Sequence, residues 1–231
     1  MNEIALNAIL NLFAVRASRF GADGREGAVA VVGRFLRSHL RIAQPQAYVE
    51  LFEAALDLHR TGDPGPRLEL ARQIAANLKS RLPRFEQLVF MVFDLELANA
   101  GRVNAGGVED EALSEVVASE LAIGRDVLLE LGLLAAGVVD PARLTHRFLA
   151  VNGPEGGEPG PCRRLRRPEF RASFVIYHEG EAGAWFIVPS GGDPISADSV
   201  ELGPGAPHLL TPGFILRDGQ GTRLYLSLIH I

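Results

Sequence analysis

Lys79 and Ser80 are the first residues to consider for chemistry, because a lysine followed by serine ends the phosphate-binding loop G-x-x-x-x-G-K-[ST]. Gln73 and Leu78 stand where that loop needs its two glycines. The surrounding pattern also places Lys79 at a helix end, whereas the loop joins a strand to a helix. The sequence therefore predicts no ATP hydrolysis by this mechanism, and any ATP and Mg²⁺ site is expected in a domain outside this chain.

The histidines do not form a zinc motif, because the sequence has no H-E-x-x-H and no histidine pair four residues apart. His178-Glu179 stands at a predicted strand end beside a turn, which is more typical of a solvated corner than of an acid–base pair. We therefore predict no catalytic residue and no bound cofactor, and the chain itself is not expected to be an enzyme. The histidines stand at positions 39, 59, 146, 178, 208 and 230.

Cys162 lies beside a run of arginines. Arg163 and Arg164 could lower the pKa of the Cys162 thiol, but no base or orienting group is in view, which argues against a nucleophile. Together with Arg166 and Arg167 they could meet a phosphate-rich surface or an acidic partner. A solvated loop explains the run about equally well.

The composition is that of an ordinary globular chain. It has 231 residues, of which 47% are hydrophobic, and a formal net charge of −5, which argues against a general nucleic-acid binder. The single cysteine fits a reducing compartment. No apolar run reaches the roughly 18 residues needed to cross a bilayer, and the start lacks the features of a signal peptide. These features predict a cytoplasmic protein without a transmembrane segment.

Residues 1–140 follow the 3.6-residue periodicity of amphipathic helices, interrupted by Gly/Pro-rich loops at 21–24 and 62–66. The fifth of seven predicted helices opens at Pro83 and is apolar on most sides, so we expect it at the centre of a bundle. The seven helices cover about 4–20, 24–40, 45–56, 70–78, 83–95, 109–121 and 125–136.

From about residue 145 the pattern changes to short apolar runs bounded by Gly, Pro or Asp, which is typical of strands. They predict a small antiparallel sheet or sandwich, and hence an α+β fold. The predicted strands cover 146–151, 172–177, 184–189, 208–212, 214–217 and 223–226. The predicted domains are a helical bundle at 1–140, a Gly/Pro/Arg-rich linker with one strand at 141–168 and an incomplete β domain at 169–225.

The helical region contains an internal repeat, in which Phe13 aligns with Phe93 and Gly21 with Gly101. Each half is an apolar helix, a Gly-containing loop followed by acids, and a second helix. With GADGREG at 21–27 and NAGRVNAGGVEDE at 99–111, the arrangement resembles the TerB-like (tellurite-resistance) helical fold. The resemblance covers about residues 1–137.

The TerB resemblance implies a divalent-cation site built from acids of the two loops. Ala100-Gly101 departs from the Asp-Gly of the family pattern and removes one carboxylate, whereas hard cations such as Ca²⁺ need six or more oxygens. The alternative is that these acids are helix N-terminal charges favoured by the macrodipole. The candidate ligands carried over are Asp23, Glu26, Glu109, Asp110 and Glu111.

The strand-like AWFIVPSGG at 184–192 and LTPGFILR at 210–217 follow the helical region. In this order the chain resembles the N-terminal region of large bacterial ABC-type ATP-binding proteins. The closing LSLIHI, residues 226–231, resembles a translated sequencing adapter, so we predict a truncated chain with a non-native tail. The alternative for that tail is a natural apolar edge strand.

The resemblance implies a non-catalytic regulatory or interaction region of a transport-related protein. Its partner would be another protein or its own downstream ATPase domain, with membrane association only through the missing part. Two alternatives stay open. One is a metal-binding TerB-like stress protein, and the other is a forkhead-associated-like phosphopeptide adaptor that would use Arg171, Ser190 and Arg217.

Overall fold

The computed structural model describes residues 2–60, 64–105, 108–153, 160–198, 200–210 and 213–225, with only the backbone at 64–65, 102–105 and 108–110. The chain divides into two compact units, a helical unit (Met1–Leu131) and a β unit (Gly132–Ile231). This division falls inside the seventh helix, whereas the predicted bundle extends to residue 140. The predicted non-native tail, 226–231, lies outside the described residues.

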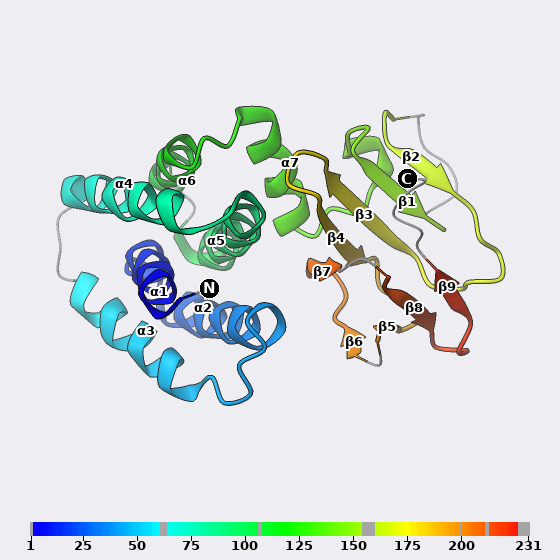
Figure 1. Cartoon of the computed structure of the whole chain (residues 1–231), viewed down its shortest axis with the longest axis horizontal. Helices are drawn as coiled ribbons and strands as arrows, with labels where there is room; N and C mark the ends of the chain where they lie inside the picture. The colour runs from blue at the N-terminus through cyan, green and yellow to red at the C-terminus, as the bar shows by residue number, and fades with distance from the viewer. Residues whose placement is uncertain are drawn as a thin grey trace. The chain divides into compact units, whose positions relative to one another are not determined.

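The seven predicted helices are confirmed, and the fold is α+β (Figure 1). A short π-helical turn, Phe35–His39, extends α2, and a 3₁₀ turn, Pro141–Arg143, follows α7. The helices are α1 (Glu3–Ala17), α2 (Ala22–Arg34), α3 (Gln46–His59), α4 (Pro64–Arg81), α5 (Arg84–Ala105), α6 (Val108–Glu120) and α7 (Arg125–Ala135).

The core of the helical unit is built around α5, as the apolar pattern predicts. Phe90 stacks on Phe13 of α1, with ring centroids 5.5 Å apart, and Phe93 meets Phe35 edge-on at 5.1 Å. These rings and Phe52 of α3 are almost completely buried. Burial of each such side chain stabilises the fold by roughly 1.5–3 kcal/mol, which ties α1, α3, α5 and the end of α2 together.

A buried ion pair crosses this core. The guanidinium of Arg16 on α1 donates to both carboxylate oxygens of Asp94 on α5, at 2.7 and 2.5 Å, and neither residue has any solvent-exposed surface. The same guanidinium donates to Oγ of Ser114 on α6 at 3.1 Å. One arginine therefore links three helices through charge-assisted hydrogen bonds.

The loop predicted around Gly101 is wrong, because α5 continues through this residue to Ala105. A Cβ placed on Gly101 would lie 2.2 Å from Cε1 of Phe20, so the ring of Phe20 packs directly on the helix backbone there. Glycine is tolerated inside this helix because it makes room for an aromatic ring.

The β unit consists of two sheets, with strand orders β2-β1-β3-β4-β7 and β6-β5-β8-β9 (Figure 1). The described strand pairs are antiparallel, as predicted, except for β1 and β2, which are parallel. The strands are β1 (Phe148–Val151), β2 (Arg163–Leu165), β3 (Phe174–Glu179), β4 (Ala184–Pro189), β5 (Ile195–Ala197), β6 (Val200–Leu202), β7 (His208–Leu210), β8 (Ile215–Asp218) and β9 (Arg223–Tyr225).

Three strands were not predicted, namely β2, β5 and β6, each only three residues long. These three segments lie outside the apolar runs from which strands are recognised in a sequence. As a result, the predicted linker at 141–168 contributes two strands to the larger sheet, β1 and β2.

One apolar cluster fills the space between the two sheets, which makes the β unit a sandwich. Alternate residues of β3 and β4, such as Phe174, Ile176, Trp185 and Ile187, enter it from the five-stranded sheet. Residues of the other sheet, including Leu216, enter it from the opposite side. At one end of this cluster Leu149, Ile176 and Trp185 also line a pocket, together with His178 on the same face of β3.

Candidate functional site: a cationic pocket on the β unit

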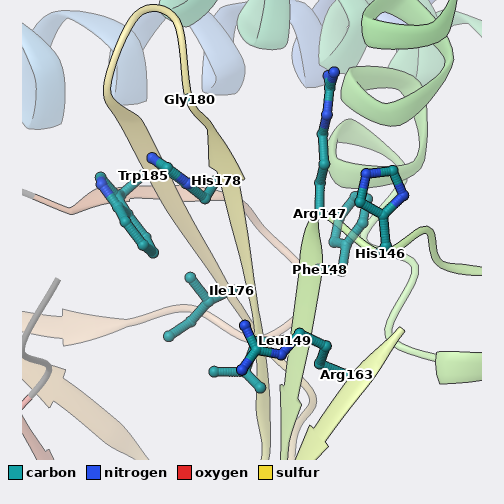
Figure 2. A pocket seen from close by; sticks show the side chains of 9 residues that line it. All are labelled: His146, Arg147, Phe148, Leu149, Arg163, Ile176, His178, Gly180 and Trp185. Carbon is teal, nitrogen blue, oxygen red and sulfur yellow. The ribbon is translucent and has the colours of Figure 1, made fainter. Parts of the chain in front are cut away.

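A pocket of about 270 Å³ opens on the β unit at the end of the five-stranded sheet where β3 turns into β4 (Figure 2). Leu149 and Ile176, two members of the inter-sheet cluster, lie at its base. The nine lining residues are His146, Arg147, Phe148, Leu149, Arg163, Ile176, His178, Gly180 and Trp185.

Three of these side chains form a row across neighbouring strands. The amide of His178 donates to the carbonyl oxygen of Arg147 at 3.2 Å, which extends the β1–β3 pairing by one residue. His178 is in turn the cross-strand partner of Trp185. Residues directly opposite one another on one face of a sheet are close enough to interact, so the hydrogen-bond register places an arginine, a histidine and a tryptophan side by side.

The rings of His178 and Trp185 stack with centroids 3.8 Å apart and planes inclined by 19°, as Figure 2 shows. The indole is almost buried and the imidazole partly exposed. The pair is therefore a flat, rigid wall on which a planar group could lie.

Arg163 enters the pocket from the neighbouring strand. The β1–β2 register pairs Arg163 with Leu149, and in Figure 2 its side chain extends from β2 over the base of the pocket. Two arginines and two histidines thus line the pocket, and none of its described lining residues is acidic. Guanidinium groups recognise carboxylate and phosphate oxygens through paired hydrogen bonds, so this lining suits an anionic group.

The electrostatics of the pocket act on His178. Burial lowers the pKa of His178 below its usual 6.5, and the positive charge of Arg147 lowers it further, while Glu179 partly opposes both. The imidazole is therefore neutral near pH 7, and an anion bound beside it would raise its pKa.

The pocket is small for a whole cofactor. Sites for drug-sized ligands occupy about 300–1,000 Å³, whereas this one has about 270 Å³. One acidic amino-acid side chain, or a phosphate carried by a side chain, suits that volume better. Its described lining residues contain no hydroxyl, thiol or carboxylate, and their charged groups are the guanidinium groups of Arg147 and Arg163, which suit an anion.

Cys162 does not match the expectation of a lowered thiol pKa. Its side chain is buried, and burial raises the thiol pKa, while a backbone hydrogen bond and the charge of Arg164 oppose that effect only in part. Arg163 does not share this role, because neighbouring strand residues point to opposite faces and Arg163 points into the pocket. The thiol is therefore poorly suited to act as a nucleophile.

The metal ligands implied by the TerB resemblance are only partly described. Asp23 lies exposed in the first turn of α2, Glu26 is exposed one turn further on, and Glu111 is exposed on α6. The structure describes only the backbone of Glu109 and Asp110. Among the described residues, no group of three or more His, Cys, Asp or Glu could hold a metal ion. The five-residue site therefore stays a prediction, and no metal-dependent step is derived from it.

The residues eligible for a forkhead-associated-like site lie at the opposite end of the β unit. The amide of Arg171 donates to Asp218 at 3.0 Å, and Ser190 pairs through its backbone with Ser173, just before β3 begins. Arg217 precedes Asp218 on β8. The pocket lies at the other end of β3, so these residues and the pocket are separate candidate sites.

Sequence reasoning singled out Arg163 and His178 but not Arg147 or Trp185. The sequence signal that bears on the pocket is the spacing of two residues along a strand. It puts residues 147 and 149 on one face of their strand, and residues 176 and 178 on one face of the neighbouring strand. Alternation alone does not say which strands are neighbours, so it cannot bring these residues together.

Comparison with known proteins gives no assignment of family or function. No family model matches the chain, and no match was found among curated proteins or solved structures. Within the described residues, no helix is long and apolar enough to cross a membrane.

Proposed function

We propose that this chain is a non-catalytic interaction region whose β unit binds an acidic or phosphorylated side chain of a protein partner. The observation that supports the proposal is that Arg147 and Arg163 line one pocket with the stacked pair of His178 and Trp185. An anion bound in this pocket would be attracted by the guanidinium groups that line it and could lie against the stacked rings.

Trp185 supplies a direct assay, because it is the only tryptophan of the chain. The full chain is titrated with glutamate-rich peptides and with phosphoserine peptides while the Trp185 emission is followed. We expect a saturable change that weakens as salt is added, and that is lost in both Arg147→Gln and Arg163→Gln. Comparing the two peptide families tells whether carboxylate or phosphate is preferred.

The matched control is Arg171→Gln, which removes the same charge at the far end of the β unit and should leave the titration unchanged. If neither peptide family changes the Trp185 emission, the pocket has no such ligand and the proposal fails. If Arg171→Gln abolishes binding while the pocket variants do not, the forkhead-associated-like alternative is supported instead.

The sequence resemblances support a wider setting for this interaction. A TerB-like bundle ahead of a small β region is the arrangement of the ABC-type proteins described above, so we propose that the bound partner or the downstream ATPase domain belongs to a transport-related, cytoplasmic ATP-binding protein. Reading the genomic DNA past codon 225 tests this. A phosphate-binding loop encoded within the next few dozen codons supports it, and a stop codon there contradicts it.

A further inference from the structure

The outer edge of β2 is a second surface that fits the same partner. β2 is an edge strand of the five-stranded sheet (Figure 1), and Arg163 and Arg164 on it are both exposed. Leu165 accepts a hydrogen bond from the amide of Asn152 at 3.0 Å, so its backbone faces β1. Because successive residues of a strand direct their backbone groups to opposite sides, the amide and carbonyl of Arg164 face outward along the edge.

The two arginines point to opposite faces of the sheet. Arg163 is paired with Leu149 and lies in the pocket, whereas Arg164 is paired with Ala150 and acts on the Cys162 thiol. An extended segment lying along this edge would therefore find a guanidinium group beside it on each face. Acidic side chains at adjacent positions of such a segment would each meet positive charge.

The segment that follows β2 is held in place by Asn152. The Asn152 side chain accepts a hydrogen bond from the amide of Arg167 at 2.7 Å and donates to the Arg167 carbonyl at 2.9 Å. It also donates to the carbonyl oxygen of Phe170. Asn152 itself has a positive φ of 50°. The backbone after the edge strand is thus fixed in advance, which lowers the entropic cost of binding.

We propose that the edge of β2 pairs with an extended acidic segment of a protein partner, and that one acidic side chain of that segment enters the pocket beside Arg163. This inference rests on the proposed function, and it adds main-chain hydrogen bonds along β2 to the binding of one side chain in the pocket. Addition of a strand to a free sheet edge gives affinity through main-chain hydrogen bonds, while the pocket gives selectivity for a side chain.

A competing role for the arginines is protection of the edge. Exposed edge strands can pair with other chains, and charged side chains on such a strand prevent this. If protection is their role, the two arginines prevent pairing with any other strand and bind no particular partner. Backbone pairing with an acidic peptide distinguishes the two roles, since protection alone gives no binding.

The test uses the full chain and a fluorescein-labelled octapeptide of glutamate and valine, with acids at adjacent positions so that both faces carry charge. Its control is the same peptide with alternate backbone amides methylated, which keeps the charge but removes donors from the ladder. By fluorescence anisotropy, we expect methylation and Arg164→Glu each to weaken binding at least about tenfold. Arg171→Glu, the matched charge reversal at the far end, should change it less than about twofold.

Equal binding of the two peptides, or unchanged binding to Arg164→Glu, overturns the strand-pairing proposal. In either case a Trp185 response that still depends on Arg163 leaves the proposed function intact, because Arg164 lies on the opposite face from the pocket. Hydrogen exchange gives a second readout, in which peptide binding slows exchange of the Arg164 amide. If neither peptide binds nor changes the Trp185 emission, strand pairing fails together with the carboxylate form of the proposed function.

Discussion

His178 and Trp185 stack across the β3–β4 hairpin with ring centroids 3.8 Å apart, and this contact connects the pocket to an optical signal. Glu179 stabilises the adjoining turn by accepting a hydrogen bond from the amide of Ala182 at 2.7 Å. The hairpin therefore fixes the imidazole against the only indole of the chain. Any change in the charge of His178 should be visible in the emission of Trp185.

We predict that Trp185 emission falls on acidification with a midpoint below pH 6.5, because burial and Arg147 lower the His178 pKa. A protonated imidazole over the indole face is a cation–π contact and quenches the emission. His178→Gln should remove the step, and Arg147→Gln should move the midpoint upward. A midpoint at or above 6.5 would contradict the effect of burial on the His178 pKa, and a step that survives in His178→Gln would contradict its assignment to the stacked pair.

The Arg16–Asp94 pair should be critical for the helical unit. Asp94→Asn leaves the Arg16 guanidinium buried without its counter-charge, and breaking a buried pair in this way costs about 3–5 kcal/mol. The measurement is urea denaturation followed by far-UV circular dichroism. The double variant Arg16→Met/Asp94→Leu should recover most of the loss, since an apolar replacement leaves no buried charge. A loss as large in the double variant as in Asp94→Asn would show that packing, and not charge, is decisive.

Two buried groups of the helical unit give its stability opposite dependences on pH. Burial raises the pKa of Glu96 from 4.5 to about 7, although Arg34 pairs with it and opposes the shift. The folded state thus holds a proton that the unfolded state releases, and stability falls as pH rises from 4.5 to 7. Burial lowers the pKa of His39 from 6.5 to about 4, so stability falls as pH drops through that range.

Single variants should separate these two effects. In Glu96→Gln only the His39 effect remains, and the free energy of unfolding should rise between pH 4.5 and 6.5 by up to about 3 kcal/mol. In His39→Gln it should instead fall across the same interval, while the wild-type chain changes little because the two effects offset each other. Urea midpoints at several pH values measure this. Parallel pH profiles for the two variants would refute the assignment.

Gly137 should not tolerate a side chain. It ends α7 with a positive φ of 65°, and a Cβ there would lie 2.3 Å from the carbonyl oxygen of Gly205. The amides of Gly137 and Val138 donate to Leu134 and Leu133, the pattern of a Schellman cap. We expect Gly137→Ala to cost at least about 1–3 kcal/mol, measured by denaturation followed through Trp185.

Gly132→Ala is the control for this position. Gly132 lies inside α7, and a Cβ on it would meet no described atom within 4 Å. Alanine is more favourable than glycine inside a helix by about 1 kcal/mol. A stabilised Gly132→Ala beside a destabilised Gly137→Ala attributes the loss to the cap and the close backbone contact. Similar effects of the two variants would rule out that explanation.

The sequence predicts most of the elements because their signals are local. Apolar residues three and four apart give all seven helices, and alternating apolar runs give the longer strands β3 and β4. Where an element depends on a distant partner, the prediction is wrong or missing. Gly101 lies inside a helix, where the lack of a side chain makes room for the ring of Phe20, and β2 is a strand because it pairs with β1.

The sequence by itself therefore determined the fold class and the supply of chemistry, namely an arginine-rich run and scattered histidines. Only the tertiary structure decided that Arg147, Arg163, His178 and Trp185 lie together, and that Arg164 faces away from them. The physical reason is the hydrogen-bond register between strands. A shift of one residue would move each side chain to the other face, and that register is set by packing of the whole sandwich core.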